Sequence, residues 1–296
     1  MPLVKTLRFI TGHPLSKGGE LQSIWRFAKW QIASRLVPGM IVHDWVGGSR
    51  FLVRVGETGM TGNVYTGLHD FADMGYLLHV LRDTDLFIDM GANVGSYTIL
   101  ACAAIGARAI AFEPAPNTYQ RLVENVRINH AESRVVCLNV GVGREEGTVR
   151  FSGGTDTTNH IAAAGETGSD LIDVPVRTLD SALVGESPAV GKMDVEGYEL
   201  PALEGAQKTL GKPSLHSMIM ELNGSGRRYG FDENGVVQMM LDYGFRMYSY
   251  NPLDRTLDDL GGRSNAEGNT IFIRNREFVA QRLATAPPFS ILGKTF

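Results

Sequence analysis

Hydrophobic and polar positions follow two alternating patterns along most of this chain. From residue 85 onward, short apolar runs such as "LFIDM" and "ARAIAFE" are each followed by a longer stretch with apolar residues three and four apart. Short apolar runs are typical of buried strands, and the longer spacing is typical of helices. Because strands that alternate with helices form parallel pairs through crossovers, the pattern predicts an α/β fold with a mostly parallel sheet covered on both faces.

The same pattern gives the order of elements. Helices are expected from about Ser96, over 115–129, over 200–210 and near 233–243, and strands over 86–90, 107–113, 134–140, 190–195 and 217–222. A β-like insertion follows the third strand at "GTVRF". The last two β runs, "FRMYSYN" and "NTIFIRN", have no helix between them. They are therefore expected to form an antiparallel hairpin at one edge of the sheet.

The first 60 residues differ in character. Leu21, Ile24, Trp25, Ile32 and Leu36 follow helical spacing, which predicts an amphipathic helix over 20–36 that ends at "PG". The segment is basic, and such a helix either contacts a membrane or an acidic partner, or packs on the main domain with its charges in solvent. We expect the packed arrangement. A short hairpin over 40–66 and a helix within "YTGLHDFADMGYLLHVL" complete this part.

Composition narrows the class of protein. Of the 296 residues 43% are hydrophobic and 20% are charged, which suits a globular chain with an ordinary core. The net charge of −4 gives no general drive towards nucleic acid or an anionic membrane. Cys102 and Cys137 have no metal-ligand spacing and are expected to be buried thiols of a reducing compartment. No secretory signal and no membrane-spanning stretch are visible, so we expect a cytoplasmic protein.

The turn after the first sheet strand carries the candidate ligand chemistry. "DMGANVG" has Gly91 and Gly95 four apart, which is neither the GxGxxG of dinucleotide binding nor a P-loop. Asp89 at the strand end would repel a pyrophosphate but favour a cation. S-adenosylmethionine (SAM) carries a sulfonium and an ammonium and has no phosphate. Asp89, Gly91, Asn93 and Gly95 are therefore predicted to bind SAM.

Three residues on the following strands extend this cofactor site. Glu113 closes the second strand, where an acid accepts ribose hydroxyls in SAM and NAD sites alike. Asn139 ends the third strand, where its side chain could hydrogen-bond the adenine amine or satisfy the following turn. Asp194 at the end of the fourth strand is expected beside the methionine end of the cofactor.

Three segments, "FIDMGANVGSYT", "AFEPAPNTYQRLVENVRIN" and "GKMDVEGYELPALEGA", resemble the signature segments of the FkbM family of SAM-dependent methyltransferases. The resemblance covers roughly residues 60–275. It implies a Rossmann-like methyltransferase fold with a seven-stranded sheet, and O-methylation of hydroxyls on sugars, polyketides or similar metabolites. We therefore expect an N-terminal extension over 1–60, a SAM-binding domain over 61–275 and a C-terminal tail over 276–296.

Methyl transfer to an alcohol needs alignment and a base. His160 in the polar loop "TDTTNHIAAAGE" is one candidate base, because imidazole titrates near neutral pH; "NH" segments also resemble family members. His69 in "YTGLHDFADM" is a second candidate. Asp194 and Glu196 in "KMDVEGYE" are further catalytic candidates, although Glu196 could simply cap the next helix.

A divalent cation is an open alternative. Asp194, Glu221 and Asn223 are hard oxygen ligands expected at adjacent strand ends, which suits Mg²⁺ or Ca²⁺. The same oxygens can equally hydrogen-bond the cofactor and loops, so a metal is not favoured.

The leading prediction is a SAM-dependent O-methyltransferase whose partner is a small-molecule or glycan hydroxyl acceptor. An NAD-dependent oxidoreductase and a non-catalytic SAM-binding module are the alternatives. The apolar segment "APPFSILGKTF" is expected to pack on its own domain or on another subunit of a homo-oligomer.

Overall fold

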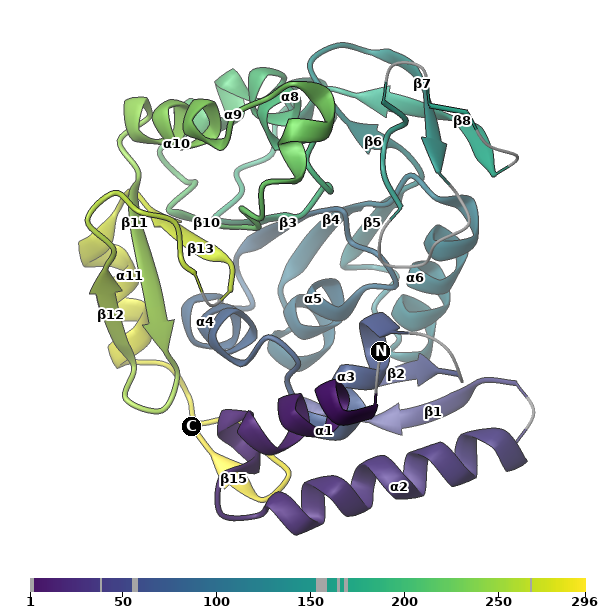
Figure 1. Ribbon diagram of the computed structural model, residues 1–296. Coiled ribbons are helices and arrows are strands. Elements are labelled where there is room, and N and C mark those ends of the chain that lie inside the picture. Colours follow the sequence, from purple (N-terminus) through teal and green to yellow (C-terminus); the bar gives the residue numbers. More distant parts are fainter. Residues whose placement is uncertain are drawn as a thin grey trace.

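The computed structural model describes residues 3–37, 39–54, 58–152, 159–163, 166–167, 170–266 and 268–296. At its centre lies an eight-stranded sheet with the strand order β12-β11-β13-β10-β9-β3-β4-β5 (Figure 1). The strands of this sheet are β3 (Leu86–Met90), β4 (Arg108–Phe112), β5 (Val135–Leu138), β9 (Val190–Met193), β10 (Ser217–Met220), β11 (Arg246–Asn251), β12 (Thr256–Asp259) and β13 (Thr270–Ile273). Five neighbours, from β10 to β5, are parallel, and β13 is antiparallel to both β10 and β11. The predicted α/β class is confirmed.

The strand order reverses beside β3. The chain runs outward from β3 to β4 and β5, and then returns to the other side of β3 through β9 and β10. In sheets of this kind the strand ends diverge at the reversal, so the crevice at the carboxyl ends of β3 and β9 is where ligands bind. The topology therefore places a binding site at Asp89, the last residue but one of β3, and at Asp194, which directly follows β9.

Helices cover both faces of the sheet, because successive side chains of a strand point to opposite sides. Phe87 packs with α4, α5, α6 and α11, whereas its neighbour Ile88 packs in a second cluster with α7 to α10. The bounds are α4 (Phe71–Val80), α5 (Ser96–Ile99), α6 (Pro116–Ile128), α7 (Leu179–Ala182), α8 (Glu199–Glu204), α9 (Gln207–Gly211), α10 (Glu233–Asp242) and α11 (Arg276–Ala284). α5 continues into a π-helical stretch over Leu100–Ile105.

The sheet departs from the expectation at its far edge. It has eight strands instead of seven, because β12 pairs with β11 and forms the edge. The last two predicted strands, β11 and β13, are antiparallel neighbours as expected, but they are not an edge hairpin: β13 lies between β11 and β10. The pattern of apolar residues along the chain does not show that β13 lies between β11 and β10. The fully buried pattern of β13 does agree with a central position.

The predicted helix over 200–210 is divided into α8 and α9. A Cβ added at Gly205 would lie 2.0 Å from the carbonyl oxygen of Gly143, so the backbone approaches a neighbouring loop closely there. That loop belongs to a small second sheet of β6 (Gly141–Val142), β7 (Gly147–Ser152) and β8 (Leu171–Arg177). The β-like insertion predicted at "GTVRF" is β7, whereas β8 was not predicted.

The N-terminal extension folds against the main domain. Its elements are α1 (Leu3–Gly12), α2 (Glu20–Leu36), β1 (Ile41–Asp44) and β2 (Arg50–Val53), and β1 and β2 form the expected hairpin. The next helix, α3 (Thr58–Thr66), crosses the expected boundary at residue 60. Ile10, Trp30 and Phe51 belong to the same hydrophobic core as the sheet residue Phe87. The predicted helix over 20–36 is confirmed as α2, but the face that it buries differs from the expected one.

The expected apolar face of α2 points outward. Leu21, Trp25, Ile32 and Leu36 are exposed, whereas Ser23, Trp30 and Ser34 on the opposite side are buried. The reason is that the inward side offers an aromatic ring and two small hydroxyls, which fit closely against α1 and α3. In the described part of the chain, none of the helices has the length and apolar character needed to cross a membrane.

Residues after β13 pack on the protein's own core. α11 is followed by β14 (Ser290–Ile291) and β15 (Lys294–Thr295), which pair in a short hairpin. The Phe296 ring lies 5.3 Å from that of Phe71 and 5.4 Å from that of His79. The apolar C-terminal segment therefore covers α4.

Candidate active site

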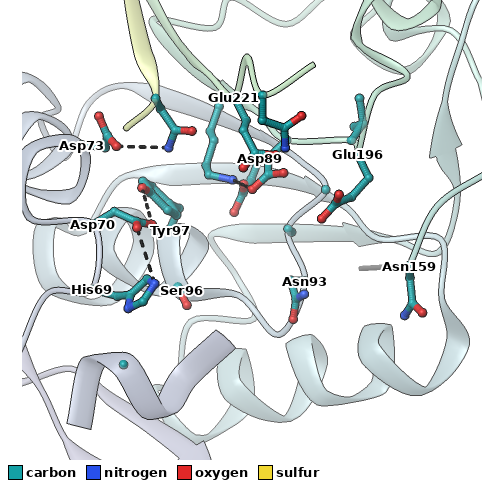
Figure 2. A pocket seen from close by; sticks show the side chains of 18 of the residues that line it. His69, Asp70, Asp73, Asp89, Asn93, Ser96, Tyr97, Asn159, Glu196 and Glu221 are labelled. Atoms are coloured by element: carbon teal, nitrogen blue, oxygen red, sulfur yellow. Dashed lines mark hydrogen bonds and ion pairs between the residues drawn. The ribbon is translucent and has the colours of Figure 1, made fainter. Parts of the chain in front are cut away.

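A cavity of about 1700 Å³ lies at the carboxyl ends of β3, β4, β9 and β10. Its wall at the strand ends includes Asp89, Glu113, Asp194 and Glu221, and its opposite wall is formed by α1, α2 and α3. Figure 2 shows His69, Asp70 and Tyr97 grouped on one side of it, with Glu196 and Asn159 on the other. Most of the predicted site residues thus converge from segments far apart in the sequence, whereas Gly95, Asn139 and His160 do not line the cavity.

The first turn holds its shape through two left-handed glycines. Gly91 has φ of 78°, and a Cβ there would lie 1.8 Å from the carbonyl oxygen of Asp194. Gly95 has φ of 97°, and a Cβ there would lie 2.7 Å from Leu122. Other residues are strained in this conformation. The glycines let the ends of β3 and β9 touch and let α5 start against α6.

Asp89 is buried at the end of β3. One carboxylate oxygen accepts a hydrogen bond of 2.6 Å from the Thr98 hydroxyl, and the other, Oδ1, is buried with no hydrogen-bond partner among the described residues. Burial raises the pKa of this acid, although the nearby Lys192 charge opposes the shift. An unpaired buried oxygen is costly unless a ligand pairs with it. Asp89 therefore fits a site for a cationic ligand.

Glu113 faces the same turn from β4. Its two oxygens accept backbone N–H groups of Asn93 at 2.9 Å and of Ala115 at 2.8 Å. Burial raises its pKa to about 7, and these two hydrogen bonds limit the shift. Because each carboxylate oxygen has a second lone pair, Glu113 can still accept two further hydroxyl groups. Asn93 has φ of 51°, and its backbone N–H donates to Glu113.

Asn139 does not face the cavity. Its side-chain amide donates to the carbonyl oxygens of Glu113 at 2.8 Å and of Pro114 at 2.9 Å, so both amide hydrogens are used. The residue thus supports the turn after β4, which is neither the adenine contact nor the following turn that the sequence left open. Beside Pro114, the cavity wall is instead formed by 140–142.

Acidic side chains form a second group at β9 and β10. Asp194, Glu196 and Glu221 each present an oxygen, and these oxygens lie within 4.8 Å of one another. The Lys192 ammonium lies 2.8 Å from Asp194 and 4.8 Å from the centre of the Tyr97 ring. Burial alone would raise the pKa of Asp194, but the charge and hydrogen bond of Lys192 outweigh it and hold this pKa low.

The neighbours of Asp194 are held closer to neutrality. Burial, and then the charge of Asp194, raises the pKa of Glu221 to about 8. The same two causes raise the pKa of Glu196 to about 7. Glu196 also has φ of 55°, a conformation that is rare outside glycine and asparagine. Strained residues with shifted pKa values are typical of functional sites.

The structure changes the set of oxygen atoms that the alternative cation site would offer. Asn223 lines the cavity, but its side-chain oxygen accepts the Ser225 N–H at 2.9 Å, and Glu196 takes its place beside Asp194 and Glu221. The Lys192 ammonium already neutralises Asp194. A lysine charge at this point repels a divalent cation.

The two candidate histidines differ in position. His69 lines the cavity, with its Nε2 3.8 Å from an oxygen of Asp70, and its side chain is 40% exposed. Of the loop over 155–166, the structure describes 159–163 and 166. There the His160 ring lies between the Ser152 hydroxyl at 3.2 Å and Glu166 at 3.1 Å. Its neighbours Asn159 and Ile161 line the cavity, whereas His160 stabilises its own loop.

Two cavity residues, Tyr97 and Asn269, were not singled out from the sequence, whereas their partners Asp70 and Asp73 were. The Tyr97 hydroxyl donates to Asp70 at 3.2 Å, and the Asn269 amide donates to Asp73 at 3.1 Å. Burial, and then the charge of Asp70, raises the pKa of Asp73 to about 8. Tyr97 could have been found one helical turn after the glycines, but nothing in the sequence around Asn269 marks it.

Comparison with known proteins agrees with this arrangement. The sequence profile of the methyltransferase FkbM domain matches residues 89–247, which is more than half of the chain and spans β3 to β11. The chain belongs to the FkbM methyltransferase family. The resemblance seen in the sequence is therefore confirmed, and a methyltransferase family implies SAM as the cofactor.

Two curated relatives are similar over parts of the chain. The hexuronic acid methyltransferase AglP of Haloferax volcanii is 28% identical over 169 residues, which cover 55% of this chain and 64% of that protein. The methyltransferase sdnD of Sordaria araneosa is 34% identical over 80 residues, 27% of this chain and 31% of its own length. The chain thus spans less than two thirds of each relative.

Solved structures include a methyltransferase FkbM from Methylobacillus flagellatus, with 20% identity and a TM-score of 0.44 over 65% of this chain and 44% of that chain. TYW2 of P. horikoshii, solved in complex with MeSAdo, has 15% identity and a TM-score of 0.40 over 80% of this chain and 70% of that chain.

Proposed function

We propose that this protein is a SAM-dependent O-methyltransferase that acts on a hydroxyl group of a sugar or a similar hydroxylated metabolite. One observation carries the proposal. Two buried acids, Asp89 and Glu113, flank the glycine turn at one end of the cavity, and a separate acidic group with Glu196 lies in the same cavity. The first pair suits a cationic nucleoside, and the second suits removal of a proton from an acceptor.

The cavity fits SAM at the strand ends. Glu113 has lone pairs left for the ribose hydroxyls, and the unpaired Oδ1 of Asp89 favours the positive end of the cofactor. The apolar wall over 140–142 gives the adenine ring a surface for packing. When bound, SAM supplies a methyl group on a positively charged sulfur.

Glu196 is the proposed general base. It lines the cavity, and its pKa of about 7 lets it be ionised and still accept a proton near neutral pH. Its oxygen lies close to Asp194, which Lys192 keeps ionised. Asp194 is then proposed to orient the acceptor hydroxyl without taking its proton. His69, which also lines the cavity, is the alternative base.

The choice of acceptor is supported by two observations. A relative named for methylation of a hexuronic acid is similar over 169 residues. The wall opposite the strand ends carries Phe9, Phe27, Trp30 and Tyr65, and aromatic side chains offer a broad apolar surface to the face of a ring. A sugar hydroxyl is the acceptor that both observations favour.

Calorimetric titration with S-adenosylhomocysteine (SAH) and with NADH tests the cofactor. We expect SAH to bind and NADH not to bind. Binding of NADH alone would make the protein an oxidoreductase and refute the proposal. Incubation with labelled SAM and a panel of neutral sugars, amino sugars and uronic acids then tests the reaction and the atom that is methylated. SAH binding without turnover on any acceptor would favour a non-catalytic SAM-binding module.

Substitution tests the base. Glu196→Gln should lower turnover by about 10²- to 10⁴-fold and leave SAH affinity unchanged. Glu204→Gln is the matched control, because Glu204 pairs with Arg144 and is absent from the cavity wall. If His69→Ala or His160→Ala abolishes turnover while Glu196→Gln retains it, the base is that histidine.

A further inference from the structure

The outward face of α2 is an apolar stripe that runs along the helix. Leu21 is 84% exposed, Trp25 65%, Ile32 60% and Leu36 76%. In Figure 1, α2 is the outermost element along one border of the molecule, with α1 and α3 on its inner side. Large apolar residues grouped in this way on a surface are typical of a contact with a partner or a membrane.

The orientation of α2 is fixed by its inner side. Arg26 donates to the Tyr65 carbonyl oxygen at 3.1 Å, and Gln31 donates to the Tyr65 hydroxyl at 3.0 Å. Trp30 is buried in the common core. Rotating the helix to bury Trp25 would break these contacts. The stripe is therefore a stable feature of this surface.

Basic residues flank the stripe. Residues 1–40 contain six lysines and arginines against the single acid Glu20, although the whole chain has a net charge of −4. Lys29 and Arg35 are both exposed and lie on the two sides of the stripe. A long helix with aromatic and aliphatic residues on one face and basic residues beside them is typical of helices that lie flat in a membrane interface.

We propose that α2 docks this protein on an anionic membrane surface, with Trp25 and Ile32 in the headgroup region and the basic side chains on the lipid phosphates. A second copy of the chain fits less well, because a symmetric contact would bring the same excess of positive charge together from both sides. An anionic lipid surface complements both the apolar stripe and the charge. The proposal does not depend on the proposed methyl transfer.

Sedimentation with vesicles tests the docking. We expect the full chain to bind vesicles that contain phosphatidylglycerol in phosphatidylcholine, and to bind pure phosphatidylcholine far less. Binding should weaken with added salt, because the electrostatic part is screened. Trp25 provides an internal signal, since Trp30 and Trp45 are buried. Its fluorescence should shift to shorter wavelength on binding.

Matched variants make the test specific. Trp25→Ser should weaken vesicle binding by about tenfold or more, and Lys29→Gln by about fivefold. Val184→Ser and Lys208→Gln are the controls, because both residues are exposed on another part of the surface and should leave binding unchanged. SAH affinity of all four variants, measured without vesicles, reports that they are folded and keeps this test separate from the proposed function.

Three results would overturn the proposal. The first is equal or absent binding to both kinds of vesicle. The second is binding that the control variants reduce as much as Trp25→Ser does. The third is a dimer in analytical ultracentrifugation that Trp25→Ser dissociates, which would make the stripe an interface between two copies of the chain.

Discussion

Replacing Glu113 by glutamine tests the cofactor site most directly. The carboxylate accepts the backbone N–H groups of Asn93 and Ala115, one on each oxygen. A glutamine of the same shape has only one oxygen. The NH2 group of its amide would then face either a backbone N–H or a ribose hydroxyl. In both arrangements at least one donor that Glu113 satisfies is left without an acceptor.

The expected loss follows from the number of hydrogen bonds. A hydrogen bond to a charged group contributes about 1.5–3 kcal/mol. If Glu113→Gln removes one such bond to the ligand, the dissociation constant for SAH rises by about 10- to 150-fold. The same carboxyl group has a pKa of about 7, so SAH affinity of the unmodified protein should also fall as the pH drops below about 7 and the acid becomes protonated.

Titration calorimetry with SAH across this pH range measures both effects. In Glu113→Gln the affinity should be lower above about pH 7, and its dependence on pH should be weaker. Glu132→Gln is the control, because Glu132 is exposed in the loop after α6. Unchanged affinity and an unchanged pH dependence in Glu113→Gln would refute the placement of the ribose.

Three further predictions concern stability and metal dependence. Gly91→Ala should lower the thermal midpoint more than Gly39→Ala does. Both glycines are left-handed, with φ of 78° and 95°, but only a Cβ at Gly91 would meet a carbonyl oxygen, at 1.8 Å. Equal losses of the midpoint in differential scanning calorimetry would contradict this close approach. The pKa values of Asp73 and Glu221 are raised to about 8, so the folded protein holds protons that the unfolded chain releases above about pH 4. Stability from these groups is therefore present at low pH and lost as the pH rises through about 8, and Asp73→Asn should flatten this decline in thermal unfolding. EDTA should leave methyl transfer unchanged, because the Lys192 ammonium already neutralises Asp194; loss of turnover that Mg²⁺ restores would show a metal site instead.

The sequence predicted the central α/β region well because its strands are short, apolar and separated by periodic helices. The ends of β3, β4 and β9 follow directly, and with them the positions of Asp89, Glu113 and Asp194. The order of the last strands did not follow. Local patterns fix where β11 and β13 begin and end, whereas their place in the sheet depends on which neighbour each one pairs with.

The direction of individual side chains was the second feature that the sequence did not predict. Glu196 and His160 both stand next to residues that line the cavity, and the sequence treats them alike. The difference arises from contacts with Ser152 and Glu166, which hold the His160 ring in its own loop. α2 is a similar case: its period was correct, but the face it buries depends on the aromatic and small residues that fit against α3.

The cavity joins two parts of the chain that can change independently. At the strand ends, the glycine turn and its two acids tolerate few substitutions, because a Cβ at Gly91 would collide with the carbonyl oxygen of Asp194. The opposite wall comes from α1, α2 and α3, within the first 66 residues. In evolution or in the laboratory, exchanging this N-terminal segment between relatives would reshape the space available to an acceptor while the strand-end machinery is inherited intact.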